Sequence, residues 1–238
     1  MTATDPLARL AGFDWCTPFI ADACVALGLP VRTGAPGLRP LVAGARVAGR
    51  ACPAKHAGSV DVFLEAIHDA AQGDVLVIDN VGRLDEGCIG DLVAGEARAA
   101  GLSGILVYGV HRDSAAIRAL DLPVWSLGTC PVGPQELRAR SLHARDAASI
   151  GRHTTVTRDD AVFLDDDGVI VVEVQEVARV IEAARDLAAR ETAQAARLLQ
   201  GDRLWDQLGL DDYLAARRDR PDLTFREHLK GRGGAIEI

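Results

Sequence analysis

The stretch GDVLVIDNVGRLDEGCIGDLVAGEARAAGLSGILVYG, residues 73–109, contains two apolar runs separated by a helical pattern. The runs are typical of strands buried on both faces, which predicts one strand at 73–79 and another at 104–108. A polar, glycine-containing loop at 80–89 and a helix at 90–100, closed by Gly101, lie between them. Strand, helix and strand in this order predict a right-handed crossover between parallel strands. The fold class is therefore expected to be α/β.

The alternation continues on both sides of this unit. Helical patterns occupy 17–30 and 59–72, with short strands and turns expected between them. A short helix at 113–123 and a strand at 124–129 follow. Thr17 is a candidate N-cap for the first helix. Together these patterns predict a mostly parallel sheet with helices packed on it.

The C-terminal part has a different pattern. Residues 161–172, AVFLDDDGVIVV, predict a hairpin that turns on Asp166, Asp167 and Gly168. A long helix follows at about 174–199, and the last forty residues hold short amphipathic pieces that are too few to form a core alone. We expect one domain over 1–200 and a helical extension over 201–238. The extension should pack on the domain or on a neighbouring subunit.

Composition narrows the class of protein. Of 238 residues, 48% are hydrophobic but only 4% are aromatic, which favours an α/β core of small aliphatic side chains over a β-sandwich. The net charge of −8 argues against a general nucleic-acid binder, although one local arginine can still bind an anion. Five cysteines without a CxxC pattern indicate free thiols in a reducing cytoplasm. We find no signal-peptide pattern and no apolar run that approaches the ~20 residues of a membrane span.

Three charged residues converge in the predicted crossover. Asp91 begins the helix, and Arg112 and Asp113 follow the second strand in the segment GVHRD. Because a crossover brings the start of the helix and the ends of both strands to one edge of the sheet, these residues should lie together. The free backbone N–H groups of Asp91, Leu92 and Val93 lie beside them and can hold a carboxylate.

This set suits the chemistry of a 2-keto acid. The helix N–H groups would hold the substrate carboxylate, and Mg²⁺ or Mn²⁺ on an aspartate would chelate the carboxylate and keto oxygens together. Arg112 would stabilise the charge that grows on the keto oxygen. The product of C3–C4 cleavage, or of loss of CO₂ from a 3-carboxyl group, would be an enolate.

Structural roles remain open for each of these residues. Asp113 can cap the helix that begins at Ser114, Arg112 can be a surface charge, and Asp91 can be a first-turn carboxylate favoured by the helix dipole. His111 is expected to be structural or to support the site from behind Arg112. His56 is expected to lie on a surface loop, with a place in the lining of the site as the alternative. Cys88 is expected to be a packing cysteine, since no activating base is evident.

The segment GDLVAGEARAAGLSGILVYGVHRD, an Asp followed by twenty residues and Arg-Asp, resembles a family signature. The family joins the 4-hydroxy-4-methyl-2-oxoglutarate aldolases to the regulators of ribonuclease E activity. IADACVALG, GDVLVIDN and LPVWSLGTCPVGP resemble other segments of it, so that the resemblance covers about residues 15–190. Where many aldolases have Gly-Glu this chain has Gly90-Asp91, and where the family often has Asp-Gly it has Tyr108-Gly109.

The resemblance implies a compact swivelling β/β/α-type fold, assembly as a homotrimer or hexamer, and divalent-metal pyruvate-aldolase activity with oxaloacetate decarboxylation. Asp113 would bind the metal directly, Asp91 would do so through water, and Arg112 would contact the keto oxygen. The implied substrate-binding set is Gly90, Asp91, Leu92, Val93 and Arg112. Glu191 of a neighbouring subunit would also approach the metal. The alternative is a non-catalytic regulator of ribonuclease activity, a class that generally lacks the aspartate found here as Asp113.

Overall fold

The computed structural model describes residues 5–230 and has one large mixed sheet at its centre. Its strand order is β1-β10-β9-β3-β4-β5-β6-β2, and a separate pair, β7-β8, lies against β3. The strands are β1 (Arg32–Thr33), β2 (Arg39–Pro40), β3 (Val47–Lys55), β4 (Val75–Asp79), β5 (Gly104–Tyr108), β6 (Val124–Ser126), β7 (Ala147–Ser149), β8 (Thr155–Thr157), β9 (Asp160–Leu164) and β10 (Val169–Glu173).

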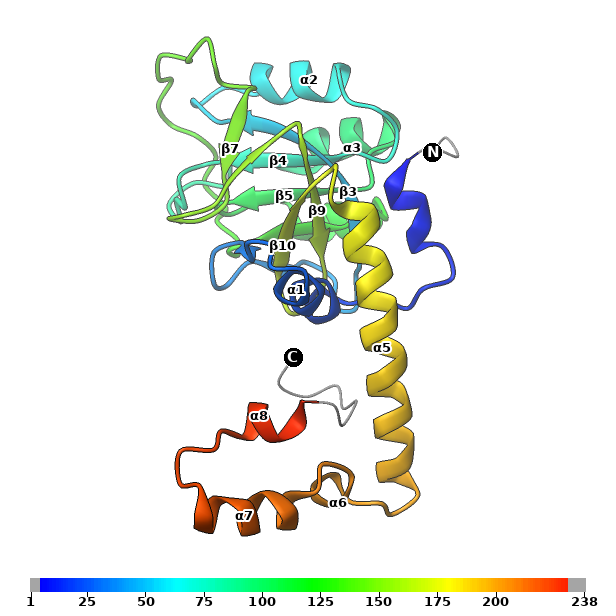
Figure 1. Ribbon diagram of the computed structural model, residues 1–238. Helices are drawn as coiled ribbons and strands as arrows, with labels where there is room; N and C mark the ends of the chain where they lie inside the picture. Colours follow the sequence, from blue (N-terminus) through cyan, green and yellow to red (C-terminus); the bar gives the residue numbers. More distant parts are fainter. Residues whose placement is uncertain (1–4, 231–238) are drawn as a thin grey trace.

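Most of the helices flank this sheet, whereas those at the C-terminal end of the chain lie beyond it, as Figure 1 shows. The helices are the 3-10 helix η1 (Pro6–Leu10) and the α-helices α1 (Thr17–Ala26), α2 (Asp61–His68), α3 (Asp91–Ala99), α4 (Ser114–Ala119), α5 (Val177–Leu199), α6 (Leu204–Gln207), α7 (Leu210–Asp219) and α8 (Phe225–Leu229).

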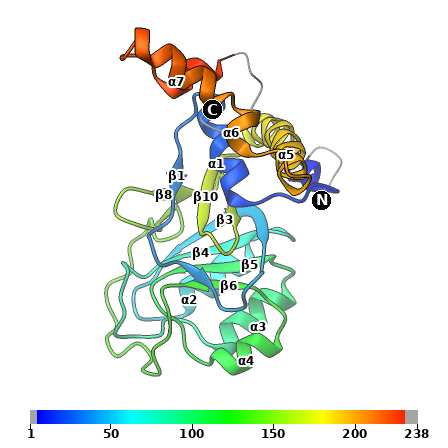
Figure 2. The same cartoon turned by 90° about the horizontal axis from the view of Figure 1, so that it is seen from below.

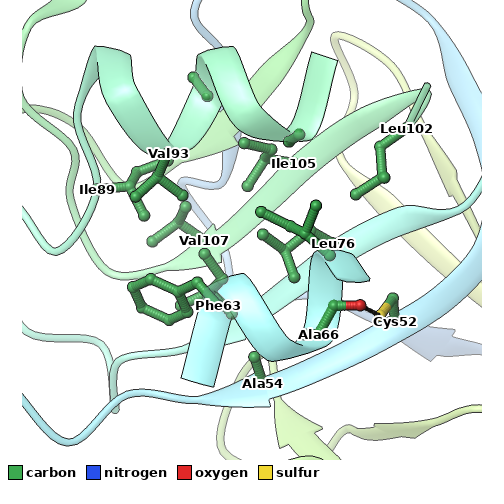
Figure 3. Close-up of a cluster of buried hydrophobic side chains, with 14 of the residues drawn as sticks. Cys52, Ala54, Phe63, Ala66, Leu76, Ile89, Val93, Leu102, Ile105 and Val107 are labelled. Carbon is green, nitrogen blue, oxygen red and sulfur yellow. Dashed lines mark hydrogen bonds between the residues drawn. The ribbon is translucent and has the colours of Figure 1, made fainter. Parts of the chain in front are cut away.

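Strands β3, β4, β5 and β6 form the parallel half of the sheet, with the register Val75↔Gly104 between β4 and β5. Their apolar residues alternate between the two faces, as the two-residue period of a strand requires. Leu76 faces α2 and α3 together with Ile105 and Val107, and Phe63 and Val93 of those helices pack against them (Figure 3). This core fixes α3 on the sheet, and with it the edge where α3 begins.

The other half of the sheet is antiparallel and curls back over the first half. Strand β9 pairs with β3 and β10, and it faces two cores at once. Phe163 packs toward α1 and α5, whereas Val162 and Leu164 join Val77 in the interior. Helices α1 and α5 therefore lie on the opposite side of the molecule from α2, α3 and α4 (Figure 2).

The α/β class, the crossover and the hairpin at 161–172 are confirmed, but two sequence predictions are wrong. The sheet is not mostly parallel, because β1, β2, β9 and β10 all pair antiparallel. The runs of β1 and β2, two residues each, carry no signal for strand direction. Thr17 does not cap α1, since Cys16 occupies that position. Instead the Thr17 N–H and hydroxyl both donate to Asp165, at 2.6 and 2.7 Å, and tie α1 to the hairpin turn.

Helix α5 extends past the sheet, and α6, α7 and α8 lie beyond its end (Figure 1). Tyr213, Phe225 and His228 form a small ring cluster there. The last eight residues of the predicted extension lie outside the described residues. Packing of the extension on a neighbouring subunit remains a prediction. Among residues 5–230, no helix is long and apolar enough to cross a membrane.

Candidate functional site

The candidate site lies at the carboxyl edge of β3, β4 and β5. After β5 ends at Tyr108, the chain runs beside the loop that leads into α3. The N–H of Cys88 donates to the carbonyl of Val110 at 3.1 Å, and the N–H of Arg112 donates to the carbonyl of Ile89 at 3.0 Å. These bonds bring Arg112 and Asp113 to the start of α3, as the crossover geometry predicts.

Asp113 occupies the N-cap position of α4 but does not cap it with its side chain. Its backbone is left-handed, with φ 58° and ψ 36°, a conformation that aspartate and asparagine adopt more readily than other residues with a Cβ. The carboxylate instead lies beside Gly90, where a Cβ on that glycine would be 2.3 Å from Oδ2. Its nearest cation is the Nε of Arg112, at 3.3 Å. The capping role for this carboxylate is therefore wrong, and its oxygens point toward the helix start.

Arg112 is held among glycines. A Cβ on Gly133 would be 2.6 Å from Nη1 of Arg112, one on Gly90 would be 3.2 Å from Nε, and one on Gly87 would be 3.0 Å from its Cβ. A side chain at Gly133 would collide with the guanidinium, and one at Gly87 or Gly90 would press against the arginine. Its side chain remains 46% exposed, so the guanidinium lies in a shallow cradle that is open to solvent.

The first turn of α3 completes the set. Its N-cap is Gly90, which has no side chain to occupy the first N–H groups. The first turn of a helix has no intrahelical acceptors for these donors, and it carries the positive end of the helix dipole. Asp91 is half-buried, Leu92 is 85% exposed and Val93 is buried against the core. The turn therefore presents backbone donors beside Arg112 and Asp113.

The donor set limits which metal could bind. Residues 5–230 contain no group of three or more His, Cys, Asp or Glu side chains that could hold a metal ion. A protein cage for Zn²⁺ or Ca²⁺ would need such a group. Mg²⁺ commonly uses one or two carboxylates, with water and substrate oxygens completing its shell. Asp113 and Asp91 fit that pattern.

Glu191 lies on the exposed half of α5. Helix α5 lies with α1 on the opposite side of the molecule from α3 (Figure 2). Its place beside a neighbouring subunit's Asp113 remains a prediction.

The structure tests three other side chains. His111 is structural, as expected: it is buried, with Nδ1 at 2.8 Å from the Ser126 hydroxyl and Nε2 at 3.0 Å from the Ser114 hydroxyl. Cys88 is a packing residue, as expected: it is buried in the hydrophobic core with Ile89 and Val93, and this burial raises the pKa of its thiol to about 12. The prediction for His56 is wrong, since its side chain is fully buried and stacks on Phe63.

The two buried histidines predict a pH dependence of stability. Burial lowers the pKa of both His56 and His111 below the ordinary value of 6.5. The unfolded chain therefore binds protons more readily than the folded one as the pH falls below that value, and the free energy of unfolding should decrease between about pH 7.5 and about pH 5.5. Urea unfolding at both pH values measures this change in the free energy of unfolding. His111→Gln should reduce this dependence and the exposed His143→Gln should not; an equal or higher midpoint at low pH would contradict the prediction.

Gly90→Ala is predicted to damage the site without unfolding the protein. The new methyl group would displace the Asp113 carboxylate, which is the flexible end of a side chain, so the helix itself should tolerate the change. A displacement of about 1 Å can cost ~10²-fold in catalysis. Thermal unfolding and kcat/KM for a 2-keto acid would be measured. Gly95→Ala is the matched control: its Cβ meets nothing within 4 Å and should add about 0.5–1 kcal/mol of stability with unchanged activity.

Two surface pockets lie away from these residues. One has a volume of about 670 Å³ and is lined by Arg32, Arg50 and Arg158 together with Asp160 and Glu173. The other, of about 340 Å³, lies near Cys16 and Asp165. Neither contains Arg112 or Asp113.

Sequence reasoning missed part of the surroundings of Arg112. Gly87 and Gly133 leave the space that the Arg112 side chain occupies. The sequence does not reveal this role, because glycines occur in loops for many other reasons. Glu86 and Asn80 are buried at the same edge, although both lie in the polar segment NVGRLDEG. The segment contains no periodicity that separates an inward side chain from an outward one.

Comparisons with known proteins agree with this architecture. A solved structure of an uncharacterized protein from Pseudomonas syringae pv. tomato is 27% identical, with a TM-score of 0.70 over 85% of this chain and 96% of its own. RraAS2 of Streptomyces coelicolor, described as an unusual member of the RNase ES inhibitor RraA family, is 25% identical, with a TM-score of 0.68 over 82% and 96%. RraA of Thermus thermophilis, described as an RNA-processing inhibitor, is 19% identical, with a TM-score of 0.51 over 63% and 90%, and shares the fold. The model of the RraA-like family, Aldolase/RraA, matches residues 17–171, and the chain belongs to that family.

Proposed function

We propose that this protein is a divalent-metal-dependent carbon–carbon lyase that acts on small 2-keto acids. The family includes aldolases and decarboxylases as well as inhibitors of ribonucleases, so membership alone does not decide between them. The observation that carries the proposal is the position of the Asp113 carboxylate. This carboxylate caps no helix and lies beside Arg112 and the start of α3.

The first task of the site is to bind and orient the substrate. The N–H groups of Leu92 and Val93 would hold the substrate carboxylate at the positive end of α3. Arg112 would donate to the keto oxygen, where its fixed cradle keeps the guanidinium aligned. Asp113, with Asp91 through water, would hold Mg²⁺ or Mn²⁺. When bound, this ion withdraws electron density from the substrate oxygens.

Cleavage then delivers an electron pair to the keto group. In a 4-hydroxy-2-keto acid such as 4-hydroxy-4-methyl-2-oxoglutarate, the 4-hydroxyl gives its proton to water and becomes a carbonyl as the C3–C4 bond breaks. The C4 fragment leaves as this carbonyl compound, which for that substrate is one molecule of pyruvate. The electron pair of the C3–C4 bond forms the enolate of pyruvate, whose oxygen is held by Arg112. In oxaloacetate the same enolate forms when CO₂ leaves. Protonation at C3 completes pyruvate in both cases.

The assembly is also a proposal. Arg112 and Asp113 are 46% and 40% exposed in one chain, whereas catalysis benefits from excluded water. A homotrimer or hexamer in the cytoplasm would cover this edge with a neighbouring subunit. Glu191 is the acidic residue that we propose the neighbour contributes.

Turnover tests the proposal. Purified protein would be mixed with oxaloacetate and with several 4-hydroxy-2-keto acids, in the presence of Mg²⁺ or Mn²⁺ and then of a chelator. The expected result is pyruvate formation well above the metal-only background, lost on chelation and restored by added metal. Pyruvate at the background rate with every substrate would sink the proposal.

A non-catalytic regulator of a ribonuclease is the second candidate. It is favoured by the likeness to the Streptomyces coelicolor protein, which is described as a member of an RNase inhibitor family. Such a regulator would act by protein–protein binding. An inactive protein that inhibits a purified ribonuclease equally well before and after Asp113→Asn would support this candidate over the lyase.

A further inference from the structure

A buried polar cluster lies at the same edge of the sheet as Arg112. His56 follows β3, Asn80 follows β4, and both side chains are buried with Glu86 of the loop before α3. Nδ1 of His56 is 2.9 Å from Oδ1 of Asn80 and 3.6 Å from Oε1 of Glu86. Buried ionisable side chains are costly unless other charges compensate them. The Glu86 carboxylate, whose side chain is only 3% exposed, therefore needs cations.

Two arginines supply that charge from different segments. Arg83, in the same loop, places Nη1 at 3.1 Å from Oε2 of Glu86. Arg138 places Nη2 at 3.6 Å from Oε1, and it comes from a separate irregular stretch. Nε and Nη2 of Arg138 are buried and have no hydrogen-bond partner among the described residues. The Glu86 carboxylate is thus the counter-charge for the partly buried guanidinium of Arg138.

We call residues 130–138, which carry this arginine, the strap. At one end the carbonyl of Val132 accepts from the N–H of Gly87 at 2.7 Å, and Gly133 lies against the guanidinium of Arg112. At the other end the N–H of Arg138 donates to the carbonyl of Ala57 at 2.8 Å. Between these points the strap has no helix or strand of its own. It therefore depends on such contacts for its position.

We infer that Glu86 is a positioning residue for Arg112. Its buried carboxylate holds the strap, through Arg138, against the loop that carries Gly87. Gly87 and Gly133 are two walls of the Arg112 cradle, one on each of the segments that Glu86 joins. Loss of the carboxylate should let these walls separate and let the guanidinium move. Glu86 itself need not touch a substrate.

Asp85 provides a matched control for this inference. It is the adjacent acid in the same loop, and it accepts two hydrogen bonds from Arg83, each of 2.9 Å. Its side chain is 70% exposed, and its only ion pair among residues 5–230 is with Arg83. Asp85→Asn therefore removes one negative charge from the same loop and one partner of Arg83, as Glu86→Gln does. It leaves the ion pair between Glu86 and Arg138 of the strap in place.

The first experiment does not depend on catalysis. Amide hydrogen exchange of the strap and the ¹⁵N resonance of Arg112 Nε would be compared in the parent, Glu86→Gln, Asp85→Asn and Arg138→Gln. We expect about tenfold or greater acceleration of exchange at Gly87 and Arg138, and a shifted or broadened Arg112 signal, in Glu86→Gln and Arg138→Gln alone. Arg138→Gln, at a partly exposed position, keeps the test valid if Glu86→Gln does not fold. Unchanged exchange and an unchanged Arg112 signal in the folded variants would overturn the inference.

The second experiment rests on the proposed function. With a keto acid that the parent cleaves, Glu86→Gln should lower kcat by about tenfold while KM changes little, because the arginine acts in the transition state. In an Arg112→Lys background the same change should have almost no further effect, since the residue through which it acts is gone. Fully additive losses would contradict the inference. An inactive parent would refute the proposed function and leave the decision on Glu86 to the exchange and resonance data.

Discussion

Asp113→Asn should reduce metal-dependent kcat/KM by ~10³-fold or more. A metal ion supplies several kcal/mol of transition-state stabilisation, and each 1.36 kcal/mol corresponds to about tenfold in rate. Asparagine tolerates the left-handed backbone of this position, so the substitution removes the charge without adding strain. Steady-state kinetics at saturating Mg²⁺, together with thermal unfolding, would measure the effect.

Asp121 offers a closely matched control for that substitution. It is an exposed aspartate that follows α4 and also has a left-handed backbone, with φ 54°. Asp121→Asn should leave both kcat/KM and stability nearly unchanged. Activity of Asp113→Asn within a few-fold of the parent would show that this carboxylate does not hold the metal.

Arg112→Lys should lower kcat by ~10²-fold or more, comparable to the loss of one oxyanion-hole donor. Lysine keeps the positive charge but lacks the planar fork that the glycine cradle aligns. Since Arg112 is proposed to contact the oxygen that becomes negative, kcat should fall more than KM rises. Initial-rate kinetics over a range of substrate concentrations would separate the two constants.

The control for the arginine lies in the next helix. Arg118 is exposed on α4, and Arg118→Lys should leave kcat and KM unchanged. Metal binding should survive in Arg112→Lys, which distinguishes loss of charge stabilisation from loss of the ion. A rise in KM with an unchanged kcat would mean that Arg112 contributes only to ground-state binding.

The position of the candidate site was predictable from sequence because it follows from topology. Two buried strands joined by a helix must place the start of α3 beside the segment after β5, whatever the side chains are. The bond from the N–H of Arg112 to the carbonyl of Ile89 is the direct consequence. Whether the Asp113 side chain would cap α4 was not predictable. That depends on the backbone angle φ of Asp113 and on the space that Gly90 leaves for the carboxylate.

The antiparallel half of the sheet and the buried cluster were not predictable for different reasons. Short strands such as β1 and β2 contain two residues each, too few to show a period or a direction. His56 and Glu86 are polar residues in loops, for which exposure is the common outcome. Both are buried here because segments distant in sequence, including Arg138, close over them. Local patterns contain no information on that closure.

Binding of Mn²⁺, followed by electron paramagnetic resonance, tests the central claim most directly. The titration would use the parent, Asp113→Asn and Asp121→Asn, with and without oxalate as a mimic of the pyruvate enolate. We expect one Mn²⁺ site per chain in the parent and in Asp121→Asn, tightened by oxalate and lost in Asp113→Asn. Equal Mn²⁺ binding by all three proteins, or none by the parent with oxalate present, would contradict the assignment of Asp113 as the metal ligand.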